Sequence, residues 1–138
     1  MKNLLTLLIG IAFSVSPLLL LAQQPDTISV KPQPRVIPLN LLSSDYQEIF
    51  HGAPETVSMH SGLVTLKTGQ SVGTHNSEEY EEIIVFLEGE GEMIITNGET
   101  LKVGHGMIAY CPPHTEHNLI AIGSTPLKYI YIAAKTTH

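Results

Sequence analysis

The sequence predicts an all-β fold, a small jelly-roll β-barrel preceded by a signal peptide and a proline-rich extended arm. Short runs of branched and aromatic residues follow one another from about residue 56 onward, separated by glycine, proline and Asn-Gly turns. No segment of this region keeps a helical period. The chain has 138 residues, 43% of them hydrophobic, which suffices for one core and leaves no room for a second catalytic domain.

The first 22 residues differ in character from the rest. Lys2 precedes an apolar run that ends near residue 21, and small Ala22 stands where a signal peptidase cleaves. We therefore predict a signal peptide over residues 1–22 and an exported chain, periplasmic or secreted. The alternative is an uncleaved membrane anchor, because the run is nearly long enough to span a bilayer. Pro17 interrupts the run and favours cleavage, after which we expect no membrane association.

The charge of the chain bears on its partners. The net charge is −6 at pH 7 with histidine neutral, and removal of residues 1–22 would make it one unit more negative. An acidic surface argues against nucleic acid or anionic lipid as the partner and leaves a small molecule as the expected ligand. The single cysteine, Cys111, cannot form an internal disulfide, and we interpret it as a small core residue.

The remaining chain divides into an arm and a barrel. Residues 23–44 are rich in proline, which prevents helix and predicts an extended arm before a barrel domain at residues 45–138. At the boundary, Ser43 and Asp45 precede a stretch up to Phe50 that favours a short helical turn. The strands are expected at residues 63–66, 82–87, 92–96, 101–103, 107–111, 117–122 and 127–134.

One of these strands is apolar without alternation. Residues 83–87 read Ile-Ile-Val-Phe-Leu, which is typical of a strand covered on both faces. A barrel packed against a second copy of itself would cover the outer face in this way. We therefore expect a homodimer.

Several polar residues stand where strands begin. His75 and Ser77 are two residues apart and would share one face of a strand. Glu82 begins the next strand, and the intervening turn residues allow it to return beside His75. His117 begins a strand after a turn that Pro112 stiffens. Spacing alone leaves open whether these side chains meet.

Two stretches of the chain form a recognisable pair. The first runs Gly69, five residues, His75, one residue, Ser77, four residues, Glu82, six residues, Gly89. The second runs Gly106, five residues, Pro112, one residue, His114, two residues, His117. Together they resemble the paired signatures of the cupin superfamily, and the likeness covers about residues 56–134.

The resemblance implies a cupin-type jelly roll with His75, Glu82 and His117 as ligands of a divalent metal inside the barrel. Ser77 stands where the family usually has another histidine. Two imidazoles and one carboxylate resemble the facial triad of non-haem Fe(II) oxygenases and the His2Glu set of zinc enzymes, and suit Fe, Mn, Ni, Co or Zn. Alternatively, Ser77 marks a cupin that has lost its metal. Glu81 is the alternative ligand to Glu82, because a one-residue slip reverses its face.

Three further residues are candidates for catalysis. His114 and Glu116 flank the second signature and could move a proton or act as a base, and Tyr80 could donate a proton at the barrel mouth. The alternative for His114 is a place on the surface of its turn, and for Tyr80 a packing role.

The sequence leaves open whether the protein is an enzyme. The first expected function is metal-dependent action on a small oxygen-rich substrate, a sugar or organic acid, as a dioxygenase, isomerase or lyase. The second is a non-catalytic module that binds a small molecule in a barrel with a degenerate metal site. The third is an accessory domain that docks a partner through a barrel edge or the arm.

Overall fold

The computed structural model describes residues 31–136, so the expected signal peptide and the start of the arm lie outside the described residues. Within this range no helix is long and apolar enough to cross a membrane. The strands are β1 (Gln47–His51), β2 (Met59–Leu66), β3 (His75–Asn76), β4 (Tyr80–Glu88), β5 (Glu90–Ile95), β6 (Thr100–Gly104), β7 (Ile108–Cys111), β8 (Glu116–Ala121) and β9 (Leu127–Lys135).

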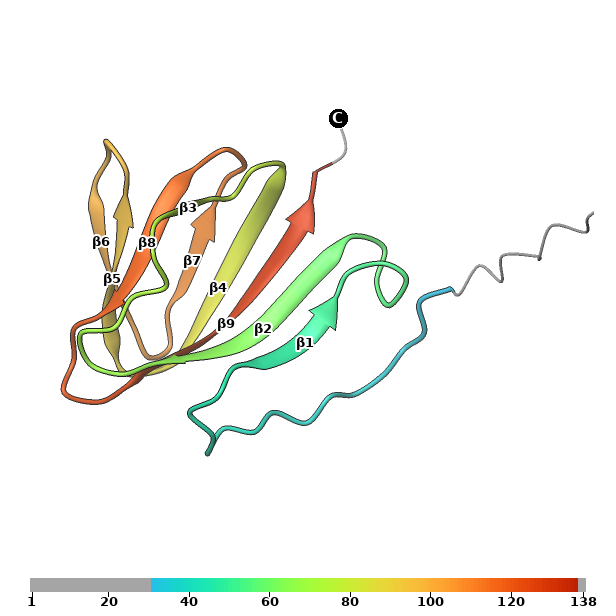
Figure 1. Cartoon of the computed structure of the whole chain (residues 1–138), viewed down its shortest axis with the longest axis horizontal. Helices are drawn as coiled ribbons and strands as arrows, with labels where there is room; N and C mark the ends of the chain where they lie inside the picture. The colour runs from blue at the N-terminus through green and yellow to red at the C-terminus, as the bar shows by residue number, and fades with distance from the viewer. Residues whose placement is uncertain (1–30, 137–138) are drawn as a thin grey trace, which may run out of the picture.

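The strands form two antiparallel sheets. One has five strands in the order β1-β2-β9-β4-β7, and the other has four in the order β3-β8-β5-β6. Figure 1 shows the smaller sheet on the left, with β3 beside β8, and the larger sheet on the right. Neighbours such as β2 and β9 are far apart in sequence, which is characteristic of a jelly roll rather than of a simple meander. The predicted all-β jelly roll is confirmed.

The hydrophobic core fills the space between the sheets. It takes residues from β2 and from β4 to β9, among them Phe86 of β4, Met93 of β5 and Leu119 of β8, all of which are almost completely buried. The aromatic rings of Phe86 and Tyr129 pack with their centroids 5.8 Å apart. The same alternation that builds the core also points Glu82 of β4 inward, because it lies two residues before Ile84.

The segment before β2 corrects one expectation. The helical turn predicted up to Phe50 is wrong, because residues 47–51 form β1 and pair with β2, with Gln47 opposite Leu63. Pairing with a long strand satisfies the backbone of this segment better than one isolated turn would. The described part of the arm runs alongside β1 in extended form (Figure 1), and the Lys128 side chain donates a hydrogen bond to the Leu41 carbonyl oxygen.

The outer face of the larger sheet is also apolar. Ile83 of β4 pairs with Tyr110 of β7 and with Ile132 of β9, while Val85 pairs with Ile108. Ile108 is 68% exposed and Tyr110 56% exposed. Strand β4 therefore has apolar side chains on both faces, as its sequence indicated, and within residues 31–136 its inner face is the better covered of the two.

Two glycines of the first signature provide a matched test of how closely the β4–β5 turn approaches Pro126. Both have left-handed backbone, with φ of +80° at Gly69 and +77° at Gly89. A Cβ at Gly69 would meet nothing within 4 Å, whereas at Gly89 it would collide with the Pro126 carbonyl oxygen. We expect Gly69→Ala to cost about 1–2 kcal/mol of unfolding free energy from backbone strain alone.

Gly89→Ala should cost about 1–3 kcal/mol more, because backbone must move to accommodate the new methyl group. Urea denaturation of both variants measures the difference. Equal losses in the two variants would contradict the close approach of the β4–β5 turn to Pro126.

Candidate functional site

Pairing of β3 with β8 brings the two signatures together. In this ladder His75 lies opposite His117, and Asn76 lies opposite Glu116. Glu82 approaches from β4 of the other sheet. One ligand atom from each of His75, Glu82 and His117 can be chosen so that all lie within 4.8 Å of one another. The structure thus joins the three residues that the cupin resemblance selected.

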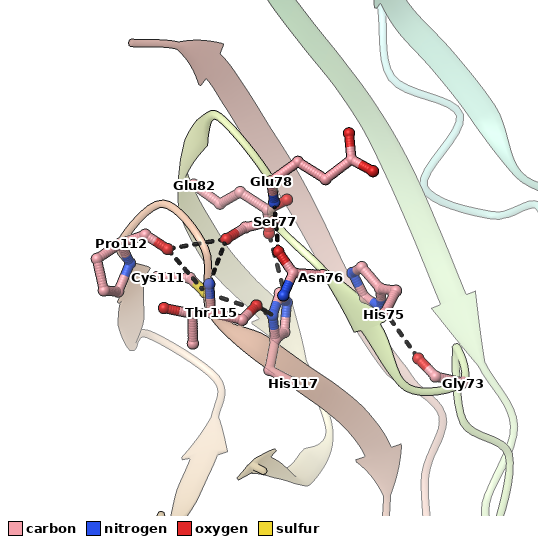
Figure 2. A network of polar contacts seen from close by, with 10 residues as sticks. All are labelled: Gly73, His75, Asn76, Ser77, Glu78, Glu82, Cys111, Pro112, Thr115 and His117. Atoms are coloured by element: carbon pink, nitrogen blue, oxygen red, sulfur yellow. Dashed lines mark hydrogen bonds and ion pairs between the residues drawn. The ribbon is translucent and has the colours of Figure 1, made fainter. Parts of the chain in front are cut away.

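The three side chains differ in exposure. His117 is only 1% exposed, Glu82 is partly buried and His75 is exposed at the rim. His117 Nε2 lies 3.4 Å from Glu82 Oε2, and the two imidazole rings are 4.4 Å apart between centroids. Figure 2 shows His75, Glu82 and His117 around a common space. Glu81, the alternative ligand, is exposed on the outer face and accepts a hydrogen bond from the Tyr110 hydroxyl.

Backbone carbonyls orient both imidazoles. Nδ1 of His75 lies 2.9 Å from the Gly73 oxygen, and Nδ1 of His117 lies 3.2 Å from the Thr115 oxygen. A carbonyl oxygen only accepts, so each Nδ1 carries the hydrogen and, in the neutral ring, Nε2 keeps a free lone pair. Metal-binding histidines are typically held in this way by a partner on the second nitrogen.

His117 also contacts the single cysteine. Cys111 Sγ lies 3.3 Å from His117 Nδ1, and both side chains are buried. The contact with Cys111, followed by that with Glu82, raises the pKa of His117 to about 10, outweighing the opposite effect of burial. A proton on His117 and a metal at its Nε2 exclude each other, so metal binding must displace that proton. Cys111 is buried as the sequence suggested, but it touches the site as well as the core.

Ser77 has a structural role that its place in the signature did not reveal. Its buried hydroxyl donates to the Pro112 carbonyl oxygen at 2.9 Å and accepts from the Thr115 amide at 2.9 Å. The Ser77 amide adds a third bond, to the Thr115 carbonyl oxygen at 3.1 Å. Figure 2 shows Ser77 against the proline turn. Ser77 therefore ties the first signature to the turn that precedes His117.

The cluster opens into a cavity of about 330 Å³ between the sheets. Its lining consists of Val64, Val72, His75, Glu82, Ile84, His117, Leu119, Tyr129 and Tyr131. A larger hollow of about 650 Å³ lies among the turns around Gly89, Gly104 and Gly123. It includes none of the three clustered residues, so we assign the chemistry to the smaller cavity.

None of the three catalytic candidates lines this cavity. His114 and Glu116 are exposed, and His114 takes a left-handed backbone conformation with φ of +59°. Tyr80 is partly buried and packs edge-on against the ring of His60, with centroids 5.7 Å apart. The cavity instead receives Tyr129 and Tyr131, which sequence reasoning did not single out. Their signal was alternation along β9, which places both on the inner face.

The Tyr129 and Tyr131 rings differ in their surroundings. The Tyr131 hydroxyl shares a 2.9 Å hydrogen bond with the Tyr46 hydroxyl, and Gly62 leaves room for the pair, because a Cβ there would collide with both rings. Burial is the main cause that raises the pKa of both Tyr129 and Tyr131, and the negative charge of Glu82 adds to it. Both phenols therefore keep their protons well above neutral pH.

The residues present fit a divalent metal. Two ligands about 2.1 Å from a tetrahedral ion are about 3.4 Å apart, which matches the distance from His117 to Glu82. Two imidazole nitrogens and one carboxylate form a set used by catalytic metal sites that keep positions open. The site could therefore hold such an ion with only small side-chain shifts.

The structure is thus a small antiparallel double-sheet barrel with a His-Glu-His cluster that could hold a metal. Residues 62–133 match the cupin domain, and the chain belongs to this family. Members of the family often bind a metal and bind small molecules. The cupin resemblance of the two signatures is thereby confirmed.

One curated relative resembles part of the chain. The uncharacterized protein MJ1618 of Methanocaldococcus jannaschii is 39% identical over 62 residues, which is 45% of this chain and 49% of that protein. The chain thus spans about half the length of this curated relative.

Solved structures share the fold at low identity. An RmlC-like cupin of Methanocaldococcus jannaschii has a TM-score of 0.64 at 15% identity, over 74% of this chain and 91% of that one. A cupin of Bacteroides fragilis has a TM-score of 0.62 at 21% identity, over 76% and 85%. A cupin 2 conserved barrel protein of Salinispora arenicola has a TM-score of 0.62 at 17% identity, over 75% and 91%.

Mutation can test the link that the Ser77 side chain makes to Pro112 and Thr115, which we call the Ser77 brace. Ser77→Ala removes both side-chain hydrogen bonds of the buried Ser77 hydroxyl and leaves the partly buried Thr115 amide with one partner fewer, so we expect a loss of about 1–3 kcal/mol of unfolding free energy. Ser77→His, which would restore the histidine usual in the family, should also destabilise, because the buried site is already filled. Chemical denaturation measures both variants, with exposed Ser124→Ala as the control.

The same variants report on the role of Ser77 in metal binding. If Ser77 is a brace, Ser77→His should not raise the affinity for Zn²⁺ measured by calorimetry. A stable Ser77→His protein that binds Zn²⁺ more tightly would contradict the brace and restore the idea of a missing ligand.

Proposed function

We propose that this protein is an exported single-domain cupin that binds a divalent metal through His75, Glu82 and His117 and uses it to bind and polarise a small oxygen-bearing molecule. The observation that carries the proposal is the convergence of the three side chains within 4.8 Å at the wall of a cavity. The carbonyl partners of both imidazoles support it, since they leave Nε2 of each ring available.

Some residues of the cavity would hold the metal, and others would enclose the bound molecule. The bound metal would supply Lewis acidity at coordination positions that the three protein ligands leave open. His75 lies at the exposed rim and His117 at the buried end, and both line the cavity, so a molecule in the cavity would lie beside the residues that would hold the metal. The apolar walls around Ile84 and Leu119 exclude water from that side, which strengthens electrostatic interactions with a bound oxygen.

A non-catalytic binding module is the second candidate. It is favoured by one observation: apart from the three clustered residues, the described lining of the cavity contains no carboxylate or imidazole that could act as a free base. Isomerase or lyase chemistry needs such a base, and His114 and Glu116, the candidates for that role, lie outside the cavity. Dioxygenase chemistry needs none, so it and simple ligand capture fit the cavity better than the other two reactions.

The homodimer and the exported location are also proposals. The outer face that carries Ile83, Ile108 and Tyr110 supports the dimer. It holds apolar side chains in a chain of net charge −6, and the one carboxylate beside Tyr110, that of Glu81, accepts a hydrogen bond from the Tyr110 hydroxyl. β7 is the last strand of its sheet, which leaves an edge available to the same strand of a second copy. Export rests on the sequence of residues 1–22.

Metal binding is tested on the purified chain without its signal peptide. We expect about one equivalent of metal per chain after chelation and anaerobic refilling with Fe²⁺, Mn²⁺, Ni²⁺, Co²⁺ or Zn²⁺. Bound metal should raise the thermal midpoint, because only the folded state holds the site. His117→Ala should lower the affinity by more than about 100-fold, since even the loss of an outer partner typically costs about 10- to 100-fold.

The matched control is His105→Ala, which removes an exposed histidine outside the cavity and should leave the metal content unchanged. Elemental analysis and calorimetry provide the measurements. A wild-type chain that takes up no stoichiometric metal, or equal losses in both variants, would refute the metal site.

The dimer is tested by charge insertion. Ile108→Lys and Ile122→Lys each place a cation at an exposed isoleucine, but only Ile108 lies on the outer face of the larger sheet. We expect light scattering after size exclusion to give a dimer mass for the wild type and for Ile122→Lys, and a monomer for Ile108→Lys. A monomeric wild type would disprove the proposed interface.

A further inference from the structure

The walls of the cavity restrict what it can hold. Polar groups gather at one end, where His75, Glu82 and His117 lie, and aliphatic side chains and tyrosine rings form the rest. A polyhydroxylated molecule such as a sugar would bring several hydroxyl groups against these walls. Each would lose its water without gaining a partner, which opposes binding.

One polar group of the wall is unusual. Tyr129 is only 3% exposed and lines the cavity, yet its hydroxyl makes no hydrogen bond to any residue in the described range. The neighbouring Tyr131 hydroxyl, in contrast, is engaged by Tyr46 at 2.9 Å. A phenol is protonated at neutral pH and can donate. The Tyr129 hydroxyl is therefore a hydrogen-bond donor on the cavity wall that is available to a molecule bound in the cavity.

Tyr129 shares its cavity with the cluster, since Tyr129 and Glu82 both line it. The charge of Glu82 is also one of the causes that raise the pKa of Tyr129, so the two side chains lie within electrostatic reach of each other. An oxygen atom held at the cluster would therefore lie near a second, protein-supplied anchor. A molecule with one oxygen-rich end can use both anchors, while its remaining atoms contact Val64, Ile84 and Leu119.

We propose that the cavity binds a small molecule with an oxygen-bearing head and an apolar body, and that Tyr129 is the positioning residue that donates a hydrogen bond to the head. This inference rests on the proposed metal site and narrows its expected substrate, because it excludes sugars and other polyhydroxylated acids. At about 330 Å³ the cavity is at the small end of ligand sites, which limits the body to roughly a single ring or short chain.

Mandelate and gluconate test the proposal, because both carry an α-hydroxycarboxylate head but differ in the body attached to it. The protein is loaded with Co²⁺, and the visible absorption of the bound ion reports binding of each acid without any assay of activity. We expect mandelate to bind at least about ten-fold more tightly than gluconate, as the burial of an apolar ring predicts.

Two conservative variants separate positioning from structure. Tyr129→Phe should weaken mandelate binding about ten-fold and leave Co²⁺ affinity unchanged, as expected for loss of one hydrogen bond to a charged group. Tyr131→Phe, whose hydroxyl is engaged by Tyr46, should change mandelate binding less than about two-fold. Thermal midpoints of both variants confirm that each is folded.

The outcomes distinguish this inference from the proposed function. If Co²⁺ binds but gluconate equals or exceeds mandelate, if neither acid perturbs the spectrum, or if Tyr129→Phe behaves as Tyr131→Phe does, the inference is wrong and the metal site stands. If the wild type binds no Co²⁺, both fail.

Discussion

The short pairing of β3 with β8 is the constraint on which the site depends. It consists of only two residue pairs, yet it sets His75 opposite His117, far apart in sequence. So short a ladder is weak by itself. The bonds of Ser77 to Pro112 and Thr115 reinforce it at the point where the chain enters β8. The residue that departs from the family signature thus stabilises the position of His75 relative to His117.

Much of the fold was predictable because its signal is local. Short apolar runs bounded by Gly or Pro turns predicted seven of the strands near their observed positions, and β4 is the clearest example, since its apolar run is uninterrupted. β1 was missed because its polar start resembles a helix cap, whereas its conformation follows from pairing with β2. Only the pairing partner distinguishes a capped helical turn from a strand here, and the sequence of the segment does not specify that partner.

In the candidate site, too, the features set by local sequence could be predicted and those set by tertiary contacts could not. His75, Glu82 and His117 could be selected because the cupin signatures fix their spacing, and the choice of Glu82 over Glu81 follows from strand alternation. The role of Ser77 and the contact of Cys111 with His117 could not be read, since each depends on a turn folding back on another strand. The candidates chosen for their chemistry and proximity in sequence, such as His114, proved to lie outside the cavity.

The electrostatics of the cluster explain why a cation belongs there. Glu82 brings a negative charge to a wall that is otherwise apolar, and a carboxylate in such a place is costly unless a positive partner accompanies it. A proton on His117, whose pKa is raised to about 10, fills that role when no metal is bound. A divalent ion bound by the proposed ligands would supply the same positive charge in place of that proton. The charge of Glu82 at one end and the apolar walls at the other are thus the features on which the proposed metal and the proposed ligand, with its oxygen-bearing head and apolar body, both rest.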